Sequence, residues 1–137
     1  MWAFVVLAGC SKSEPKPADA AWVSGIKAWY CGAEARDGGT TRDVAMKLTP
    51  TEDSFTGTFA LHDATDTYIG SLSRFQAAAD RSAKLQWKND HKQKGEAVFT
   101  FAPDFSSVTV TWDGQAAGST LQAAAGPAEC VAGKLIK

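Results

Sequence analysis

Apolar and polar residues alternate with a period of two along most of the chain from Ala21 onward, and this pattern predicts β-strands. Val44, Met46 and Leu48 share one face of the first clear strand, and their polar neighbours lie on the other face. No amphipathic stretch is long enough to predict an α-helix. The pattern therefore predicts an all-β fold.

The same alternation recurs in several later segments. Their apolar sets are Phe55/Gly57/Phe59/Leu61, Tyr68/Gly70/Leu72, Ala83/Leu85/Trp87, Ala97/Phe99/Phe101 and Val108/Val110/Trp112. Ile69 and Phe75 fall on the second face of the segment that begins at Tyr68, which makes that strand less regular. We expect a first strand around residues 26–31 and a last one within residues 119–131. The Ala-rich stretch 115–128 has no clear period and fits a loop or a helical turn.

Short polar segments rich in Gly, Pro, Asn and Asp separate the predicted strands, at residues 49–53, 62–66, 89–95 and 103–107. Short links join antiparallel neighbours. About eight strands is the usual number for a small closed barrel. We therefore predict a small antiparallel up-and-down β-barrel of about eight strands, with a two-sheet β-sandwich as the alternative.

The longest apolar run lies at the amino terminus, at residues 2–9, and is far shorter than the about 20 residues with which a helix crosses a bilayer. It ends in Leu7-Ala8-Gly9-Cys10, which resembles the lipobox of bacterial lipoproteins. The resemblance implies a signal peptide at residues 1–9 and a mature amino terminus at Cys10, lipidated with palmitate. No Lys or Arg precedes the run, so we expect the signal peptide to be truncated at its start.

An anchor of two or three acyl chains holds a protein at a membrane permanently. In the lipoprotein family, Asp after the lipidated Cys retains the protein at the inner membrane, whereas this chain has Ser11. The resemblance therefore implies the outer membrane, on its periplasmic side. Residues 10–20 combine prolines with mixed charges and are expected to form a flexible tether, followed by the barrel domain at residues 21–137. The alternative is a chance apolar start with a free Cys10 in a cytoplasmic protein.

If Cys10 is lipidated, two of the three cysteines remain, Cys31 and Cys130, and they can pair with each other. Exported proteins reside where disulfides persist. The first and last strands of a closed meander are neighbours, and we expect these two cysteines to lie in those strands. A Cys31–Cys130 disulfide is therefore predicted, with two free buried thiols as the alternative.

The sequence offers little that indicates catalysis. His62 and His91 both lie in predicted turns, without the spacing of a metal site. Asp63 and Asp66 are explained by capping of a hairpin turn. Motifs of nucleophilic catalysis or phosphate binding are absent from the sequence, and a formal net charge of −1 with scattered Lys and Arg provides no basic surface for nucleic acid. We therefore predict a protein without enzyme activity, metal or cofactor.

Four aromatic residues are candidates for lining a ligand cavity: Trp29, Tyr68, Trp87 and Trp112. A barrel of this strand number can hold one small apolar or lipid-like molecule, although a packed core would also require bulky inward side chains. The Gly-containing aromatic segment Phe55-Thr-Gly-Thr-Phe59 resembles strands of avidin-like and lipocalin-like small barrels. That resemblance implies a ligand cavity at one mouth of the barrel.

A hairpin loop carries Lys88, His91, Lys92 and Lys94, and these cations could contact an acidic partner, although such runs are also common in solvated turns. Together, the aromatic set and this loop favour a binding module for a small ligand, or alternatively a protein-binding envelope factor.

A second resemblance concerns the alternative function. The segments Tyr30-Cys31, Ser71-Leu72-Ser73 and Trp87-Lys88 resemble parts of the membrane-bound lysozyme inhibitors, which are lipoproteins with a small disulfide-closed barrel. It implies that Ser71, Ser73 and Lys94 contact the lysozyme cleft. A lysozyme inhibitor is therefore the specific form of the protein-binding alternative.

Overall fold

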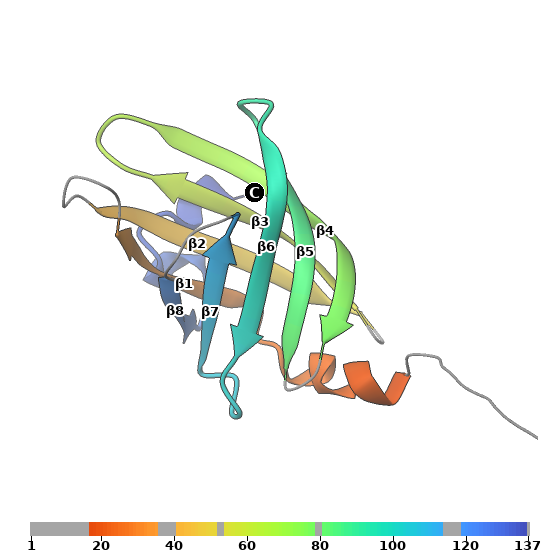
Figure 1. Ribbon diagram of the computed structural model, residues 1–137. Helices are drawn as coiled ribbons and strands as arrows, with labels where there is room; N and C mark the ends of the chain where they lie inside the picture. The colour runs from red at the N-terminus through yellow and green to blue at the C-terminus, as the bar shows by residue number, and fades with distance from the viewer. Residues whose placement is uncertain (1–16, 36–40, 52–53, 79–80, 114–118, 137) are drawn as a thin grey trace, which may run out of the picture.

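The computed structural model describes residues 17–35, 41–51, 54–78, 81–113 and 119–136, and in them eight antiparallel strands close into a barrel (Figure 1). Each strand pairs with the next in sequence, and β8 pairs with β1. The strands are β1 (Trp29–Ala35), β2 (Thr41–Pro50), β3 (Phe55–His62), β4 (Thr67–Ala78), β5 (Ser82–Asn89), β6 (Lys94–Phe101), β7 (Ser107–Trp112) and β8 (Ser119–Ala124). The predicted up-and-down barrel is confirmed, and the sandwich alternative is wrong.

The alternation seen in the sequence is the alternation between the inside and the outside of the barrel. Successive side chains of a strand point to opposite faces, so the apolar sets all point inward and form one core. The largest fully buried side chains of this core are Tyr30, Phe55, Phe59, Phe99, Phe101, Met46, Leu48, Leu85 and Leu121. Burial of these side chains is the main favourable term in folding.

Phe75 departs from the simple alternation because β4 contains an irregularity. The pairing of β4 with β5 shifts between Ser73 and Gln76, and Arg74 has a φ of 57°. This bulge changes the inside–outside alternation, so that Phe75 points inward and packs 5.1 Å from Phe55, measured between ring centroids. Ile69, before the bulge, remains outside and is 36% exposed.

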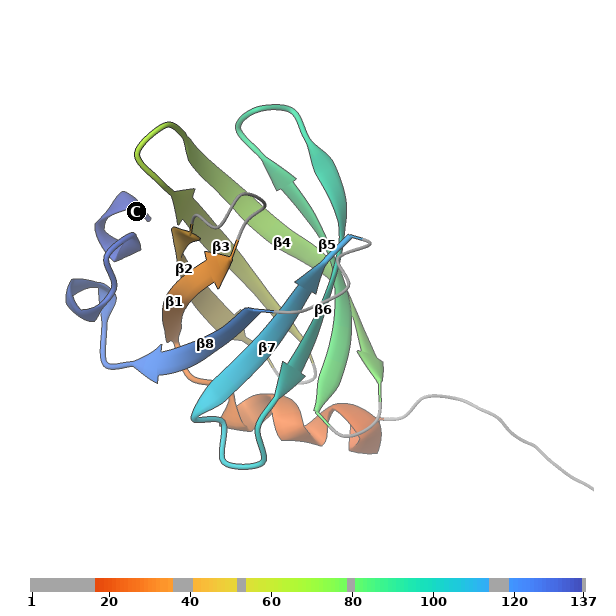
Figure 2. The same cartoon turned by 60° about the vertical axis from the view of Figure 1, so that its left-hand side comes forward.

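A 3-10 helix, η1 (Pro17–Gly25), closes one end of the barrel, here called the base (Figure 2). Val23 is fully buried in the core, and the Trp22 ring lies 5.8 Å from that of Phe101. The helix starts at Pro17, so the last residues of the segment expected as an extended tether are helical.

Tyr30 ties the connection after η1 to the β6–β7 hairpin. Its hydroxyl donates a hydrogen bond to the carbonyl oxygen of Phe105 at 2.8 Å and accepts one from the backbone N–H of Lys27 at 3.2 Å. Burial raises the pKa of Tyr30, the hydrogen bond from Lys27 opposes this, and the nearby charge of Asp104 adds to it. The buried ring and its hydroxyl thus hold together two loops at the base.

The carboxyl-terminal segment, with η3 (Pro127–Glu129) and η4 (Gly133–Leu135), packs on the outside of the barrel (Figure 2). There it forms a second buried cluster whose members are Trp29, Ala45, Ala60, Cys130, Ala132 and Ile136. This cluster covers outward-facing side chains of β1, β2 and β3.

The predicted disulfide between Cys31 and Cys130 is present, with a Cα–Cα distance of 5.6 Å and a sequence separation of 99 residues. The expectation that Cys130 lies in the last strand is wrong, because β8 ends at Ala124. Cys31 points outward and its neighbour in β8 is Gln122, so its bridging partner comes from the chain that folds over the outer face. The disulfide therefore fastens the carboxyl-terminal segment to the barrel wall.

Cys10, the predicted signal peptide and most of the predicted tether lie outside the described residues. Within the described ranges, none of the helices has the length and apolar character needed to cross a membrane.

Candidate functional site

A cavity of about 250 Å³ lies at the end of the barrel opposite η1, here called the mouth, where the β3–β4 and β5–β6 hairpins turn. The described part of its walls comes from five strands and from the β5–β6 hairpin. The lining residues are Arg42, Phe59, Leu61, Tyr68, Trp87, Asn89, Gln93 and Trp112. The site therefore combines an aromatic wall with a few polar groups, which is typical of small-molecule sites.

Three rings form the aromatic wall. Trp87 and Trp112 meet edge to face, with centroids 6.1 Å apart and an interplanar angle of 89°. The Phe59 ring lies 5.3 Å from that of Trp112 and 6.4 Å from that of Trp87. The two edge-to-face contacts of Trp87 and the tilted contact between Phe59 and Trp112 hold the three rings in fixed positions.

Gly70 makes room for this wall. A Cβ atom at position 70 would lie 2.4 Å from the Phe59 ring and 2.3 Å from the carbonyl oxygen of Lys88. Because a methyl group cannot occupy that space, only Gly at this inward position of β4 lets Phe59 lie across it. Gly70 thus lets the Phe59 ring form the bottom of the cavity.

An ion pair lies beside the rings. Glu34 is 1% exposed, and its carboxylate accepts a hydrogen bond from Nε of Arg42, its direct neighbour on β2. The Arg42 guanidinium carbon lies 5.9 Å from the centroid of the Tyr68 ring. The second Glu34 oxygen, Oε1, is buried without a hydrogen-bond partner among the described residues.

Glu34 and Arg42 were not among the residues predicted to line a site. Both have the inward parity of their strands, shared with Tyr30 on β1 and with Val44 on β2. A pair of opposite charges at inward positions near two strand ends is a signal that could have identified them, since buried charges are normally paired.

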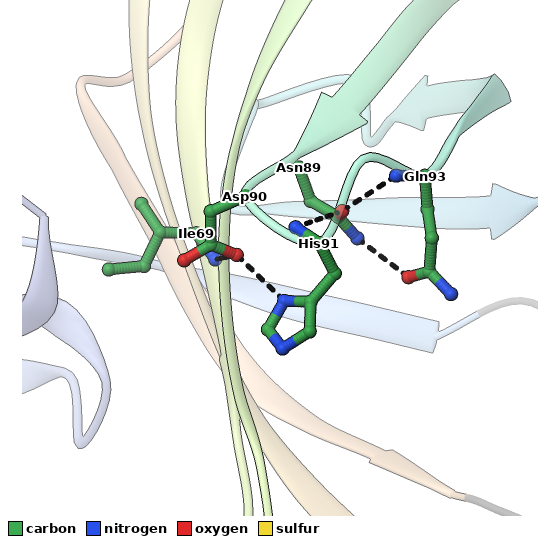
Figure 3. Close-up of polar contacts among 5 residues, drawn as sticks. All are labelled: Ile69, Asn89, Asp90, His91 and Gln93. Atoms are coloured by element: carbon green, nitrogen blue, oxygen red, sulfur yellow. Dashed lines mark hydrogen bonds and ion pairs between the residues drawn. The ribbon is translucent and has the colours of Figure 1, made fainter.

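The β5–β6 hairpin has a fixed internal structure (Figure 3). Oδ1 of Asn89 accepts hydrogen bonds from the backbone N–H groups of His91 and Gln93, at 2.9 and 3.1 Å. Nδ2 of Asn89 donates to Oε1 of Gln93 at 2.9 Å. The two amide side chains therefore hold each other at the rim of the cavity.

Asp90 anchors this hairpin to the start of β4. Its carboxylate accepts a hydrogen bond from the N–H of Ile69 at 3.1 Å (Figure 3). The N–H of Asp90 in turn donates to the carbonyl oxygen of Ile69 at 2.9 Å. The carboxylate also bonds Nδ1 of His91 at 2.9 Å, and the His91 ring lies 4.2 Å from that of Tyr68. The pKa of Asp90 is lowered, chiefly by the Ile69 N–H and further by His91.

Three of the four aromatic residues predicted as cavity lining come together there: Tyr68, Trp87 and Trp112. Trp29 lies elsewhere, 8% exposed in the outer cluster next to Cys130. Tyr30 is the inward residue of that pair, because consecutive residues of a strand cannot face the same side.

The residues predicted to contact a protein partner lie on the outside of the barrel and on the β5–β6 hairpin. Lys88, His91, Lys92 and Lys94 are all exposed, and His91 also contacts Asp90 and Tyr68. Ser71 pairs with Lys88, and Lys88 pairs with Lys94, so these three form one row across the outside of the barrel. The exposed Ser73 lies one inside–outside repeat further along β4, opposite Gln86.

Asp63 caps the β3–β4 turn, as expected from the sequence. Its Oδ1 accepts hydrogen bonds from the N–H groups of Thr65 and Asp66, both at 2.8 Å. His62 bonds the Thr67 hydroxyl through Nδ1 at 2.8 Å. Among the side chains that the structure describes, no group of three or more His, Cys, Asp or Glu is arranged to hold a metal ion.

Comparisons of the chain with protein-family models, curated proteins and solved structures gave no significant match. The cavity is therefore the feature that bears on function. Its described lining offers aromatic rings, amides and a guanidinium, which are groups of the kind found in small-molecule sites.

Proposed function

We propose that this protein is a non-enzymatic binding module of the bacterial cell envelope, which holds one small apolar or lipid-like ligand at the mouth of its barrel. Lipidated Cys10 would anchor it to the outer membrane, on the periplasmic side. The observation that carries the proposal is the cavity of about 250 Å³ walled by Tyr68, Trp87 and Trp112. The volume of this cavity lies just below the about 300–1,000 Å³ typical of ligand pockets, so the cavity suits a small molecule.

The two ends of the barrel support this proposal by their contrast. At the base, η1 and the rings of Phe55, Phe75 and Phe101 fill the interior. At the mouth the rings stand around a space instead of filling it. Stability alone requires a filled interior, so a walled cavity at one end favours a role in binding.

Filling the cavity tests the binding function. Leu61 lines the cavity, and Leu61→Phe should occupy part of it, whereas Val98→Phe adds the same ring at a position 42% exposed on the outside. The full chain carrying Cys10→Ser, expressed in a bacterial envelope, is examined by native mass spectrometry. We expect a bound small molecule in the parent and in Val98→Phe, and its loss in Leu61→Phe. Equal adducts in both variants, or none in the parent, would contradict the proposal.

Metabolic labelling with palmitate tests the anchor separately. We expect the label in the full chain and its loss in Cys10→Ser, with Cys31 and Cys130 unaffected because they form the disulfide. Labelling that persists in Cys10→Ser, or is absent from the parent, would remove the anchor and the outer-membrane location together.

A protein-binding envelope factor, such as a lysozyme inhibitor, is the second candidate, and the outer row formed by half-buried Ser71 and exposed Lys88 and Lys94 is the observation that favours it. Opposite charges steer protein association, so these lysines could meet an acidic surface. Lys92→Glu with Lys94→Glu should then weaken lysozyme binding and inhibition. Unchanged capture of lysozyme and of envelope proteins would reject the loop as the binding surface.

A further inference from the structure

We infer that the mouth cavity selects a small ring compound whose polar group is an oxygen acceptor, first of all an aromatic carboxylate. This inference rests on the proposed binding function and specifies the ligand of the same cavity. Some hydrogen-bonding atoms of the lining are already bonded within the protein, and others remain available to a ligand. The available atoms determine the class of ligand.

Gln93 presents a donor to the cavity, and its orientation follows from the hairpin. Two backbone N–H groups, which can only donate, bond one atom of the Asn89 amide, so that atom is the oxygen. The other Asn89 atom is then the NH₂ group, and the Gln93 atom that it meets at 2.9 Å must be Oε1. The remaining end of Gln93 is its NH₂ group, which is a donor (Figure 3).

Arg42 presents donors as well. Its Nε is used by Glu34, which holds the guanidinium in place at the cavity wall. A guanidinium carries five N–H donors and no acceptor, and a single bond through Nε uses one of them. Its Nη groups are thus suited to a carboxylate, which they can bind through paired hydrogen bonds.

The acidic groups near the mouth do not reverse this preference. Glu34 is bound to Arg42 and does not itself line the cavity. Asp90 is bound to Ile69 and His91, and Asp63 caps its own turn. Tyr68 can donate or accept and does not discriminate. Among the described lining residues, the polar atoms that distinguish ligands are therefore the donors of Arg42 and Gln93.

The rings and the volume define the rest of the ligand. Trp87, Trp112 and Phe59 offer ring faces and edges to a flat apolar body. A volume of about 250 Å³ accommodates one or two fused rings, whereas a long acyl chain would extend beyond it. We therefore expect the cavity to prefer an aromatic carboxylate to a fatty acid.

Three probes with the same ring system test the polarity of the site: 2-naphthoate, 2-naphthamide and 2-naphthylmethylamine. Their binding to the full chain carrying Cys10→Ser is measured by isothermal titration calorimetry, with palmitate as a fourth probe. We expect 2-naphthoate to bind about tenfold more tightly than the amine, with the amide between them, because only the carboxylate satisfies the donors without adding donors of its own.

One isosteric substitution assigns the effect to the cavity. Gln93→Glu keeps an oxygen that accepts from Asn89 and replaces the free NH₂ donor by an anionic acceptor. Gln122→Glu makes the same change at an exposed position of β8, opposite Cys31 on the outside of the barrel. We expect about tenfold weaker binding of 2-naphthoate in Gln93→Glu and no change in Gln122→Glu, with circular dichroism verifying the fold of both.

The outcomes separate this inference from the proposed function. If the amine or palmitate binds more tightly than 2-naphthoate, and Leu61→Phe blocks it, the cavity is a binding site but the inferred ligand class is wrong. If 2-naphthoate binds equally to the parent and to Gln93→Glu, the assigned donor role is wrong. If none of the four probes binds, the inference fails, whereas a native adduct lost in Leu61→Phe would still support the binding function.

Discussion

Arg42 and Glu34 lie directly opposite each other on β2 and β1, and the guanidinium donates a hydrogen bond to a carboxylate that is 1% exposed. Buried ion pairs often contribute little net stability, because the cost of removing both charges from water offsets their attraction. Their more consistent effect is to fix the position of the groups. Here the pair holds a guanidinium at the wall of the cavity, beside the Tyr68 ring.

Arg42→Met removes one partner of this pair and leaves the Glu34 carboxylate buried without a counter-charge. We expect the free energy of unfolding to fall by about 3–5 kcal/mol. The double variant Glu34→Leu, Arg42→Met replaces both charges by apolar side chains and should recover most of this loss. Urea unfolding of the two variants measures the difference in the free energy of unfolding. An Arg42→Met variant as stable as the parent would show that Arg42 does not stabilise the buried Glu34 carboxylate.

Gly70→Ala places a methyl group where the Phe59 ring and the carbonyl oxygen of Lys88 leave no space. We expect a loss of about 1–3 kcal/mol in the free energy of unfolding, together with a shifted Phe59 and an altered cavity. Gly126→Ala is the matched control, because nothing lies within 4 Å of its added Cβ and its φ of −178° is extended. Equal denaturation midpoints for both variants would contradict the tight packing at position 70.

Replacing both cysteines of the disulfide by Ser removes a cross-link between positions that are 99 residues apart. In chain-entropy terms a loop of this length contributes about 4–5 kcal/mol to the free energy of unfolding, and we expect a loss of that order. Thermal unfolding of the double variant, compared with the parent in the presence and absence of a reductant, measures it. A parent protein whose melting temperature is insensitive to reductant would speak against the bridge.

Tyr30 makes the free energy of unfolding depend on pH in the alkaline range. Burial raises its pKa above the 10.0 of the free side chain, so the folded state retains a proton that the unfolded state releases. The stabilisation is therefore complete below about pH 10 and is lost as the pH rises through the folded-state pKa.

Tyr30→Phe removes this dependence and also leaves the Phe105 carbonyl and the Lys27 N–H without their partner. We expect a loss of about 1–3 kcal/mol at neutral pH and a smaller difference from the parent above pH 10. Urea titrations across this range measure both effects. Parallel curves for parent and variant up to pH 12 would show that Tyr30 does not titrate with unfolding.

The barrel could be predicted from the sequence because apolar residues alternate with polar ones along each strand, as inward and outward side chains do. Val108, Val110 and Trp112 alternate with polar residues, and the short polar links determine the antiparallel order. Two local features were not predicted. The short helix η1 lacks the length that a helical period needs, and the bulge at Arg74 changed the side on which Phe75 lies.

The cavity was predictable only in part, for a related reason. The inward positions of Tyr68, Trp87 and Trp112 follow from alternation. That Tyr30 points inward and Trp29 outward depends on which face of β1 the carboxyl-terminal segment covers. The roles of Asn89 and Gln93 depend on the hydrogen-bond geometry of one hairpin. No periodic pattern encodes that geometry, so the sequence does not reveal it.

The most direct test of a ligand site at the mouth uses the indole N–H resonances of the tryptophans in ¹⁵N-labelled full chain carrying Cys10→Ser. Trp87 and Trp112 wall the cavity, and Trp29, in the outer cluster, is an internal control. We predict that titration with 2-naphthoate shifts the resonances of Trp87 and Trp112, with saturation, and leaves that of Trp29 in place. Equal shifts of all three, or none with 2-naphthoate and palmitate alike, would contradict a ligand site at the mouth.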